Sequence, residues 1–193
     1  MKPKIRCNWV TDDPLYIHYH DTEWGVPTFD DRLLFEFLVL EGMQAGLSWI
    51  TVLKKRENYR ACLDNFNPKK IIHYDQKKLA ALMANPGIIR NRLKIESILR
   101  NAKAYFEVER EFGSFSNYIW QFTQGKPIKN AWKHSKFAPA TNDISDKFSK
   151  DLKKRGFNFV GSTICYAFMQ AVGMVNDHTV GCFRYQEVKT TDL

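Results

Sequence analysis

The 193-residue sequence has few cysteines, no long apolar run and almost no strand-type alternation of polar and apolar residues. Four cysteines are too few for a disulfide scaffold at this length, so we expect their thiols to be reduced or bound to metal. No signal peptide is evident near the N-terminus, and the longest apolar stretch, residues 164–175, is too short to span a membrane. These absences exclude a disulfide-rich secreted module and a membrane protein, and they predict a cytoplasmic location.

The sequence is rich in aromatic and basic residues. It has 14 Phe, 8 Tyr and 5 Trp, and its formal net charge is +8. A basic domain rich in aromatic side chains favours an anionic partner such as nucleic acid, because Lys and Arg release counterions from phosphates and aromatic faces stack on bases. The same charge can serve solubility alone, so composition leaves both interpretations open.

Apolar periodicity predicts an all-α fold. Helices are expected from the Asp30-Asp31 pair to about residue 40, and over residues 47–53, 74–83, 88–106, 114–122, 144–155, 162–172 and 176–182. Within 88–106, Leu93 is among the residues assigned to the core face. The polar, proline-containing connection 124–143 separates two helical groups, so residues 1–183 form either one domain with a loop or two lobes. Residues 184–193 are interpreted as a tail.

Histidines and cysteines near the two ends of the chain offer metal ligands. His178 and Cys182 are spaced i, i+4, so a helix would place both on one face. Cys7 and either His20 or His18 could complete a tetrahedral Cys2His2 set of the kind that suits zinc. Four protein ligands would leave no position for a reactive water, so such a zinc would be structural. The alternative is a buried thiol beside ordinary surface histidines.

A basic, glycine-containing segment spans residues 152–163. Two helices joined by a short turn can present backbone N–H groups and a helix N-terminus to a phosphate, as in a helix-hairpin-helix motif. That motif usually has two glycines at the turn, and Phe159 occupies the place of the first. A plain connection between helices with a solvated basic face explains the same pattern.

Glu41 continues the apolar face of its predicted helix, in a stretch that ends at Trp49. An unpaired charge is costly to bury there. Glu41 therefore either pairs with a basic residue, the commoner outcome, or meets a ligand that donates hydrogen bonds or carries positive charge.

Several long motifs resemble the DNA-3-methyladenine glycosylase I family. They are Trp9-Val10 with Asp13-Pro14-Leu15-Tyr16, then residues 19–27, 44–56, 87–92, 153–161 and 175–178. The resemblance covers about the first 183 residues. It implies a helix-hairpin-helix DNA glycosylase fold with a zinc-stapled segment that joins the two ends of the chain, and it selects His20 over His18 as a ligand.

The resemblance also assigns site residues. The implied zinc ligands are Cys7, His20, His178 and Cys182. The implied base-binding residues are Glu41, Tyr19 and Trp49, with Trp9, Tyr16 and Trp24 as pocket walls. The implied DNA-binding residues are Gly46, Leu47, Gly161, Thr163 and Lys154, with Leu47 as the plug that fills the gap left by the extruded base.

The implied activity is hydrolytic removal of 3-methyladenine from double-stranded DNA by a monomer, with the free base as product and without lyase activity. Many helix-hairpin-helix glycosylases have a catalytic Asp where this sequence has Asn176, a departure that the resembled family shares. Glu41 is then expected to act in recognition of the cationic base. The rival interpretations are a zinc-stapled DNA-binding protein without catalysis and, on weaker grounds, a zinc hydrolase or deaminase.

Overall fold

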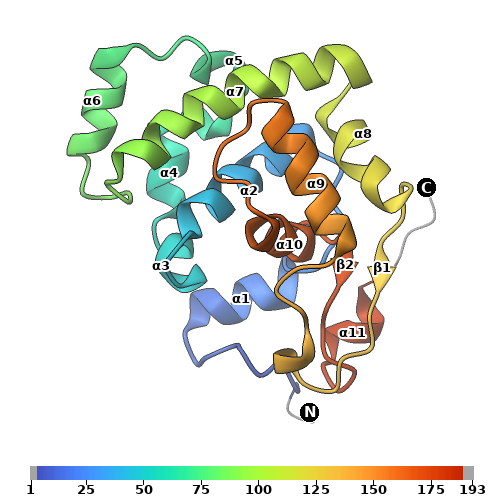
Figure 1. Cartoon of the computed structure of the whole chain (residues 1–193). Helices are drawn as coiled ribbons and strands as arrows, with labels where there is room; N and C mark the ends of the chain where they lie inside the picture. The colour runs from blue at the N-terminus through green and yellow to red at the C-terminus, as the bar shows by residue number, and fades with distance from the viewer. Residues whose placement is uncertain (1–3, 189–193) are drawn as a thin grey trace.

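The computed structural model describes residues 4–188 and shows a bundle of helices around a buried centre, with one very small sheet (Figure 1). The helices are α1 (Pro14–Thr22), α2 (Asp31–Gln44), α3 (Trp49–Leu53), α4 (Arg56–Cys62), α5 (Pro68–Ile71), α6 (Gln76–Ala84), α7 (Arg92–Phe112), α8 (Phe115–Trp120), α9 (Asp143–Lys154), α10 (Ser162–Ala171) and α11 (Arg184–Glu187). Short 3-10 turns are η1 (Asp64–Phe66), η2 (Gln121–Thr123) and η3 (Ser135–Phe137). The prediction of an all-α fold is confirmed.

Side chains that cap the N-termini fix where several helices begin. The Asp30 carboxylate accepts a hydrogen bond from the Leu33 N–H at 2.7 Å, which starts α2. At α9, Asn142 and Ser145 form a reciprocal capping box, in which each side chain accepts a hydrogen bond from the other residue's backbone N–H. These starts are therefore specified locally, before any tertiary contact forms.

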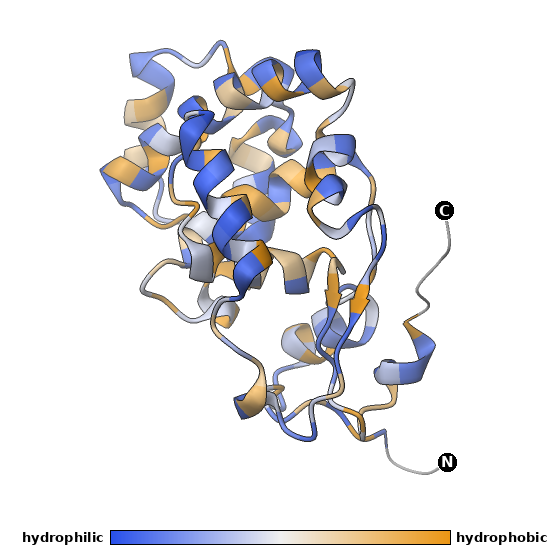
Figure 2. Cartoon of the chain, turned by 45° about the vertical axis from the view of Figure 1, so that its right-hand side comes forward, coloured by the Kyte–Doolittle hydropathy of each residue, from blue (hydrophilic) through white to orange (hydrophobic). Residues whose placement is uncertain are grey.

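α2 lies at the centre of the molecule. From Leu34 to Met43 every residue is buried, and the helix packs against α3, α7, α8 and α10. The outer helices are amphipathic and alternate hydrophilic and hydrophobic residues along their length (Figure 2). Within the described residues no helix combines the length and the apolar character needed to cross a bilayer.

The buried apolar residues form one cluster that extends from Cys7 to Cys182. It includes residues on both sides of the connection 124–143, and Ile128 within the connection packs against it. We propose on this ground that residues 1–183 are one domain. The tail begins with α11, and its last five residues lie outside the described part of the chain.

The predicted helix over residues 176–182 is wrong. Val175–Asn176 is the strand β2, which pairs in parallel with β1 (Ile128–Lys129). Backbone hydrogen bonds run from the Ile128 N–H to the Met174 carbonyl and from the Asn130 N–H to the Asn176 carbonyl. Pairing with a segment almost fifty residues away, which local spacing does not reveal, holds this stretch extended.

Other differences concern helix boundaries and one core residue. Leu93, expected in the core, is 63% exposed, whereas Lys94 and Ile95 in the same first turn of α7 are buried. The expected helix at residue 47 begins at Trp49 instead, after a turn at Gly46 with φ +76°. The short helices α1, α4 and α5 were not predicted. For α1 and α5 the signal was present, since each starts with a proline that follows an Asp or Asn cap.

We predict that Gly173→Ala destabilises the fold far more than Gly125→Ala. Both glycines have φ near +75°, which costs an L-residue about 1–2 kcal/mol. At Gly173 an added Cβ would also lie 2.3 Å from the Pro27 nitrogen, whereas at Gly125 nothing lies within 4 Å. Overpacking adds about 1–3 kcal/mol or more. Denaturant unfolding of both variants measures the difference, and equal losses would refute the packing argument.

Candidate functional site

Four buried ligand atoms meet where the N-terminal segment, α1 and residues 178–182 come together. Cys7, His20, His178 and Cys182 each offer one atom, and these atoms all lie within 4.8 Å of one another. Sγ of Cys7 is 3.5 Å from His178 Nδ1, and Sγ of Cys182 is 3.5 Å from His20 Nε2 and 3.6 Å from His178 Nδ1. Zinc–sulfur and zinc–nitrogen bonds in a tetrahedron place sulfur and nitrogen about 3.6 Å apart. The four residues could therefore hold one metal ion.

The second nitrogen of each histidine ring also has a partner. His20 Nδ1 is 2.8 Å from the Asp21 carboxylate, and His178 Nε2 is 3.0 Å from the Trp24 carbonyl. Such outer contacts orient histidine ligands and set their tautomer. His18, the competing candidate, is exposed and lies outside this cluster. His178 and Cys182 lie in the segment that follows β2, not in a helix. The expected i, i+4 helical spacing was therefore the wrong reason for pairing them, although their side chains do lie side by side.

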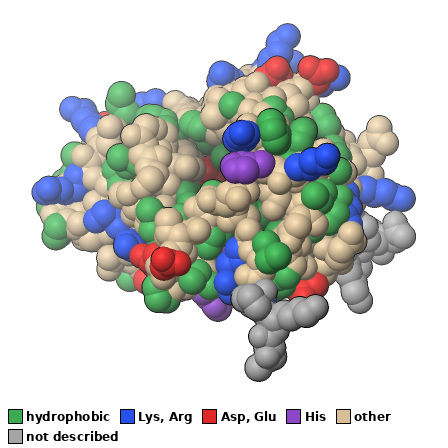
Figure 3. Space-filling view, turned by 90° about the horizontal axis from the view of Figure 1, so that it is seen from below, with side chains coloured by type: hydrophobic (Ala, Val, Ile, Leu, Met, Phe, Trp, Pro, Cys, Tyr) green, Lys and Arg blue, Asp and Glu red, His purple; other side chains and the backbone are tan. Residues whose placement is uncertain are grey.

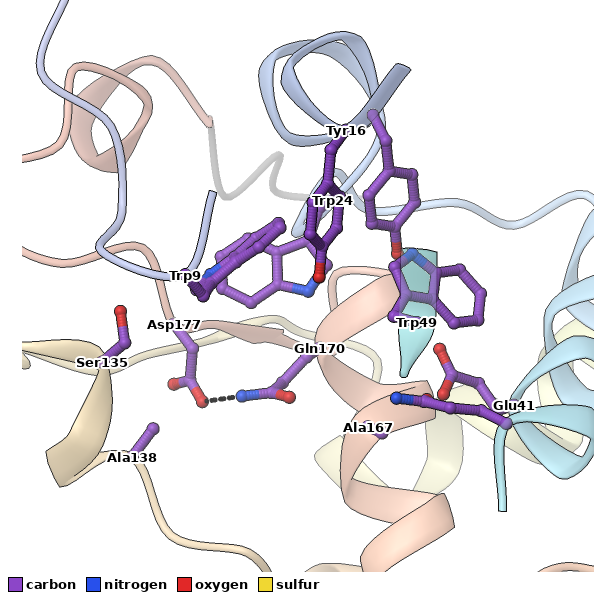
Figure 4. Close-up of a pocket in the computed structure, with 12 residues that line it drawn as sticks. Trp9, Tyr16, Trp24, Glu41, Trp49, Ser135, Ala138, Ala167, Gln170 and Asp177 are labelled. Atoms are coloured by element: carbon purple, nitrogen blue, oxygen red, sulfur yellow. Dashed lines mark hydrogen bonds between the residues drawn. The ribbon is translucent and has the colours of Figure 1, made fainter. Parts of the chain in front are cut away.

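An aromatic pocket of about 590 Å³ opens beside this centre (Figure 4). It lies between α1, α2, α3, α10 and η3. Its lining residues are Trp9, Tyr16, Tyr19, Trp24, Glu41, Gln44, Trp49, Ser135, Ala138, Ala167, Gln170 and Asp177. All six residues expected to bind or enclose a base are among them. Tyr16 and Trp24 lie close to Trp9, with ring centroids 5.0 and 4.9 Å from its own.

Glu41 has no cationic partner among residues 4–188. Its side chain is 3% exposed, and burial raises its pKa to about 8. Glu36, one and a half turns earlier on α2, is also fully buried, but its carboxylate binds Arg56 at 2.6 Å and Arg60 at 2.7 Å. The structural pairing considered for Glu41 is thus found at Glu36, while Glu41 faces the pocket.

Unfilled hydrogen-bonding capacity is concentrated in this pocket. Three of its buried side-chain atoms have no hydrogen-bond partner in the part of the chain that the structure describes, namely Glu41 Oε2, Trp49 Nε1 and Ser135 Oγ. Buried polar atoms are nearly always satisfied, so a group of orphans in one cavity is typical of a ligand site. An acceptor at Glu41 and a donor at Trp49 match a ring with both donor and acceptor edges.

The sequence interpretation missed half of the lining residues. Asp177 is the most connected of them, for it is 2% exposed and its carboxylate accepts hydrogen bonds from Tyr166 and Gln170 of α10 at 2.8 Å. Asp177 belongs to the family-like motif at residues 175–178, next to Asn176, and that motif could have indicated it. Ser135 and Ala138 come from the connection 124–143, where no local pattern marked them.

A second hollow adjoins the aromatic pocket and shares Glu41, Gln44 and Ala167 with it. Gly46, Leu47 and Thr163 also line this hollow, and Leu47 is 42% exposed. We name it the Leu47 hollow.

The other expected DNA-binding residues lie outside the Leu47 hollow. Gly161 caps the N-terminus of α10 beside it. Lys154 lies elsewhere, in a depression with Glu111, Asp151 and Arg155. Phe159, at the place of the first hairpin glycine, has a φ of +55°, so the left-handed turn is kept without glycine.

Comparison with known proteins decides the family. The family model described as methyladenine glycosylase matches residues 9–185. This chain belongs to that family. It is 53% identical over 180 residues to DNA-3-methyladenine glycosylase 1 of Escherichia coli K12, which covers 93% of this chain and 96% of the relative. Identity to a DNA-3-methyladenine glycosylase of Haemophilus influenzae is 51%, over 92% and 96%.

Solved structures of the family share the fold. A crystal structure of 3-methyladenine DNA glycosylase I superposes with a TM-score of 0.91 at 54% identity, over 93% of this chain and 98% of that one. A structure that addresses 3-methyladenine recognition by the Staphylococcus aureus enzyme has a TM-score of 0.90 at 37% identity, over 92% and 95%.

We predict that Glu41→Gln stabilises the empty protein above pH 5. Because the pKa of Glu41 is about 8 in the folded protein and its ordinary value is 4.5, the folded state retains a proton that the unfolded state releases between these pH values. Wild-type stability should therefore fall as pH rises from 4.5 to 8, by several kcal/mol at about 1.4 kcal/mol per pKa unit. Unfolding of both proteins at pH 5 and 8.5 tests this, and a pH-independent difference would contradict it.

Proposed function

We propose that this protein is a DNA base-excision repair glycosylase that removes 3-methyladenine from alkylated DNA. The observation that carries the proposal is the buried, unpaired Glu41 carboxylate in an aromatic pocket. Relatives more than 50% identical over nearly the whole chain are named for this activity. A related structure contains 3-methyladenine itself.

The pocket suits a flipped, positively charged base. Adenine methylated at N3 carries positive charge while it is still attached to the sugar, and desolvated aromatic faces attract a cation by about 2 kcal/mol. The Tyr19 and Trp49 rings lie 5.4 Å apart, centroid to centroid. The Glu41 carboxylate would accept hydrogen bonds from the exocyclic amine and complement the charge. A bound cation would in turn favour the ionised form of Glu41 and so oppose the rise in its pKa that burial causes.

Excision needs little help from a general acid. The C1′–N9 bond breaks, its electron pair stays with the base, and the base leaves as a neutral molecule. Water adds to the oxocarbenium-like sugar carbon and loses a proton to solvent. Asn176 is fully buried, and its side chain bonds the His178 N–H and the Tyr185 carbonyl, so it supports the metal segment. No lysine is among the described residues that line the pocket, in keeping with a monofunctional enzyme without lyase activity.

Zinc fits the metal cluster. Two thiolates and two imidazoles at tetrahedral spacing are a typical structural zinc set. Bound zinc would cross-link the N-terminal segment to residues 178–182, and the walls contributed by Trp9, Trp24 and Asp177 adjoin its ligands. All four ligands are protein groups, which disfavours a zinc hydrolase or deaminase.

The DNA would lie over the Leu47 hollow. Leu47 would fill the gap in the duplex, while Gly161 and Thr163 at the start of α10 would meet a phosphate. Lys154, at the end of α9, would add basic charge to the hairpin that α9 and α10 form. We propose that a monomer acts on double-stranded DNA. A DNA-binding protein without catalysis would have no use for the unpaired carboxylate at Glu41.

Glu41→Gln should fold and retain its metal but release 3-methyladenine about 10- to 100-fold more slowly. The factor follows from about 1.5–3 kcal/mol for a hydrogen bond to a charged group. Chromatography of bases released from methylated duplex DNA measures it. Glu107→Gln, on an exposed site of α7, is the matched control and should act like wild type. Undiminished release by Glu41→Gln would refute the role of Glu41, and no release by wild type would refute the function.

The metal proposal predicts one zinc per chain by elemental analysis. Cys182→Ala should lose the zinc, whereas Cys62→Ala, outside the cluster, should keep it. Chelation should lower the melting temperature of the wild type, since a ligand present at about 1,000 times its Kd stabilises by about 4 kcal/mol. A wild-type protein that is purified without zinc and is indifferent to chelator would contradict the assignment.

A further inference from the structure

Residues 130–138, here called the strap, form one wall of the aromatic pocket. The strap leaves β1, crosses the lower face of the molecule in Figure 1 and includes η3. Ser135 and Ala138 line the pocket from this side, opposite Glu41 (Figure 4). A connection without any family motif is therefore part of the pocket rim.

The start of the strap is held firmly in place. Asp177 Oδ1 accepts hydrogen bonds from Asn130 Nδ2 at 2.6 Å and Trp132 Nε1 at 2.8 Å, while its Oδ2 bonds to α10. The Val180 N–H also donates to the Trp132 carbonyl at 2.9 Å. Hydrogen bonds to an ionised carboxylate are stronger than those between two neutral groups. Asp177 thus positions the strap relative to the floor of the pocket.

The outer side of the strap is basic and partly apolar. Lys133 and Lys136 are exposed, and no ion pair involves either of them within residues 4–188. Phe137 is 57% exposed, and Lys136 Nζ lies 5.2 Å from its ring centroid. The His134 ring accepts the Lys136 N–H at 3.1 Å, which holds the turn. The lower face shows histidine and lysine or arginine side chains gathered beside a hollow (Figure 3).

The pocket and the Leu47 hollow adjoin and share Glu41, Gln44 and Ala167, so the strap and Leu47 border neighbouring hollows. A nucleotide whose base occupies the pocket keeps its sugar and two phosphates at the pocket mouth. We propose that the strap is a second DNA-contact surface, in which Lys133 and Lys136 bind backbone phosphates beside the flipped nucleotide and Phe137 packs against its sugar. The inference rests on the proposed function, because it takes DNA as the substrate.

The test is the salt dependence of binding to a duplex that contains a stable abasic-site analogue. Each phosphate contact contributes about 0.9 to the slope of log K against log salt concentration. The double variant Lys133→Ala/Lys136→Ala should reduce that slope by about 1.8. The matched control is Lys69→Ala/Lys77→Ala, which removes two exposed lysines from α5 and α6, at the opposite end of the molecule (Figure 1). It should leave the slope unchanged.

Two further measurements separate the possible outcomes. The strap variant should bind free 3-methyladenine as wild type does, and Lys133→Arg/Lys136→Arg should restore the slope. A strap variant with the wild-type slope, or with the same slope as the control pair, overturns the proposal. Release of 3-methyladenine from methylated DNA by the wild type is measured in parallel, so failure of the strap and failure of the glycosylase function remain distinguishable.

Discussion

The burial of the Glu41 carboxylate without a cationic partner is the constraint on which the pocket depends. Desolvation of that group raises its pKa to about 8, and the cost is not offset by any nearby base. The same helix carries Glu36, where Arg56 and Arg60 remove the cost. α2 therefore bears one carboxylate that is paired with arginines of the protein and one that is left for a ligand. A cationic base would supply the positive charge that no described residue places beside Glu41.

The walls around Glu41 come from segments that are far apart in the sequence. Trp9, Tyr16 and Trp24 belong to the N-terminal region, Asp177 follows β2, and Ser135 belongs to the strap. The cluster of Cys7, His20, His178 and Cys182 brings the N-terminal region and the segment after β2 together. The Asp177 carboxylate joins the strap to α10. The Cys/His cluster and the Asp177 hydrogen bonds are each a small set of buried polar contacts between segments that are distant in the sequence. Such contacts fix the relative position of two segments more sharply than apolar packing alone.

Much of the fold was accessible from local signals, because caps and apolar periodicity act over a few residues. The helices α2, α6, α8, α9 and α10 begin within about two residues of where periodicity predicted them. The error at residues 176–182 has a different origin, since parallel pairing with β1 depends on a partner that periodicity does not report. Leu93 was misplaced because the packing of α7 buries Lys94 and Ile95 and leaves the neighbouring Leu93 on the solvent side.

The sequence by itself determined the chemical inventory: the four residues that could hold a metal, the carboxylate at Glu41 and the aromatic residues that accompany it, with motifs long enough to indicate a family. It could not show that Glu36 takes the arginines while Glu41 remains unpaired, because either glutamate continues an apolar face. Only the tertiary structure decided that, together with the placement of Asp177, Ser135 and the strap. The reason is physical, for desolvation and hydrogen-bond satisfaction are properties of the assembled surroundings, which residues distant in the chain create.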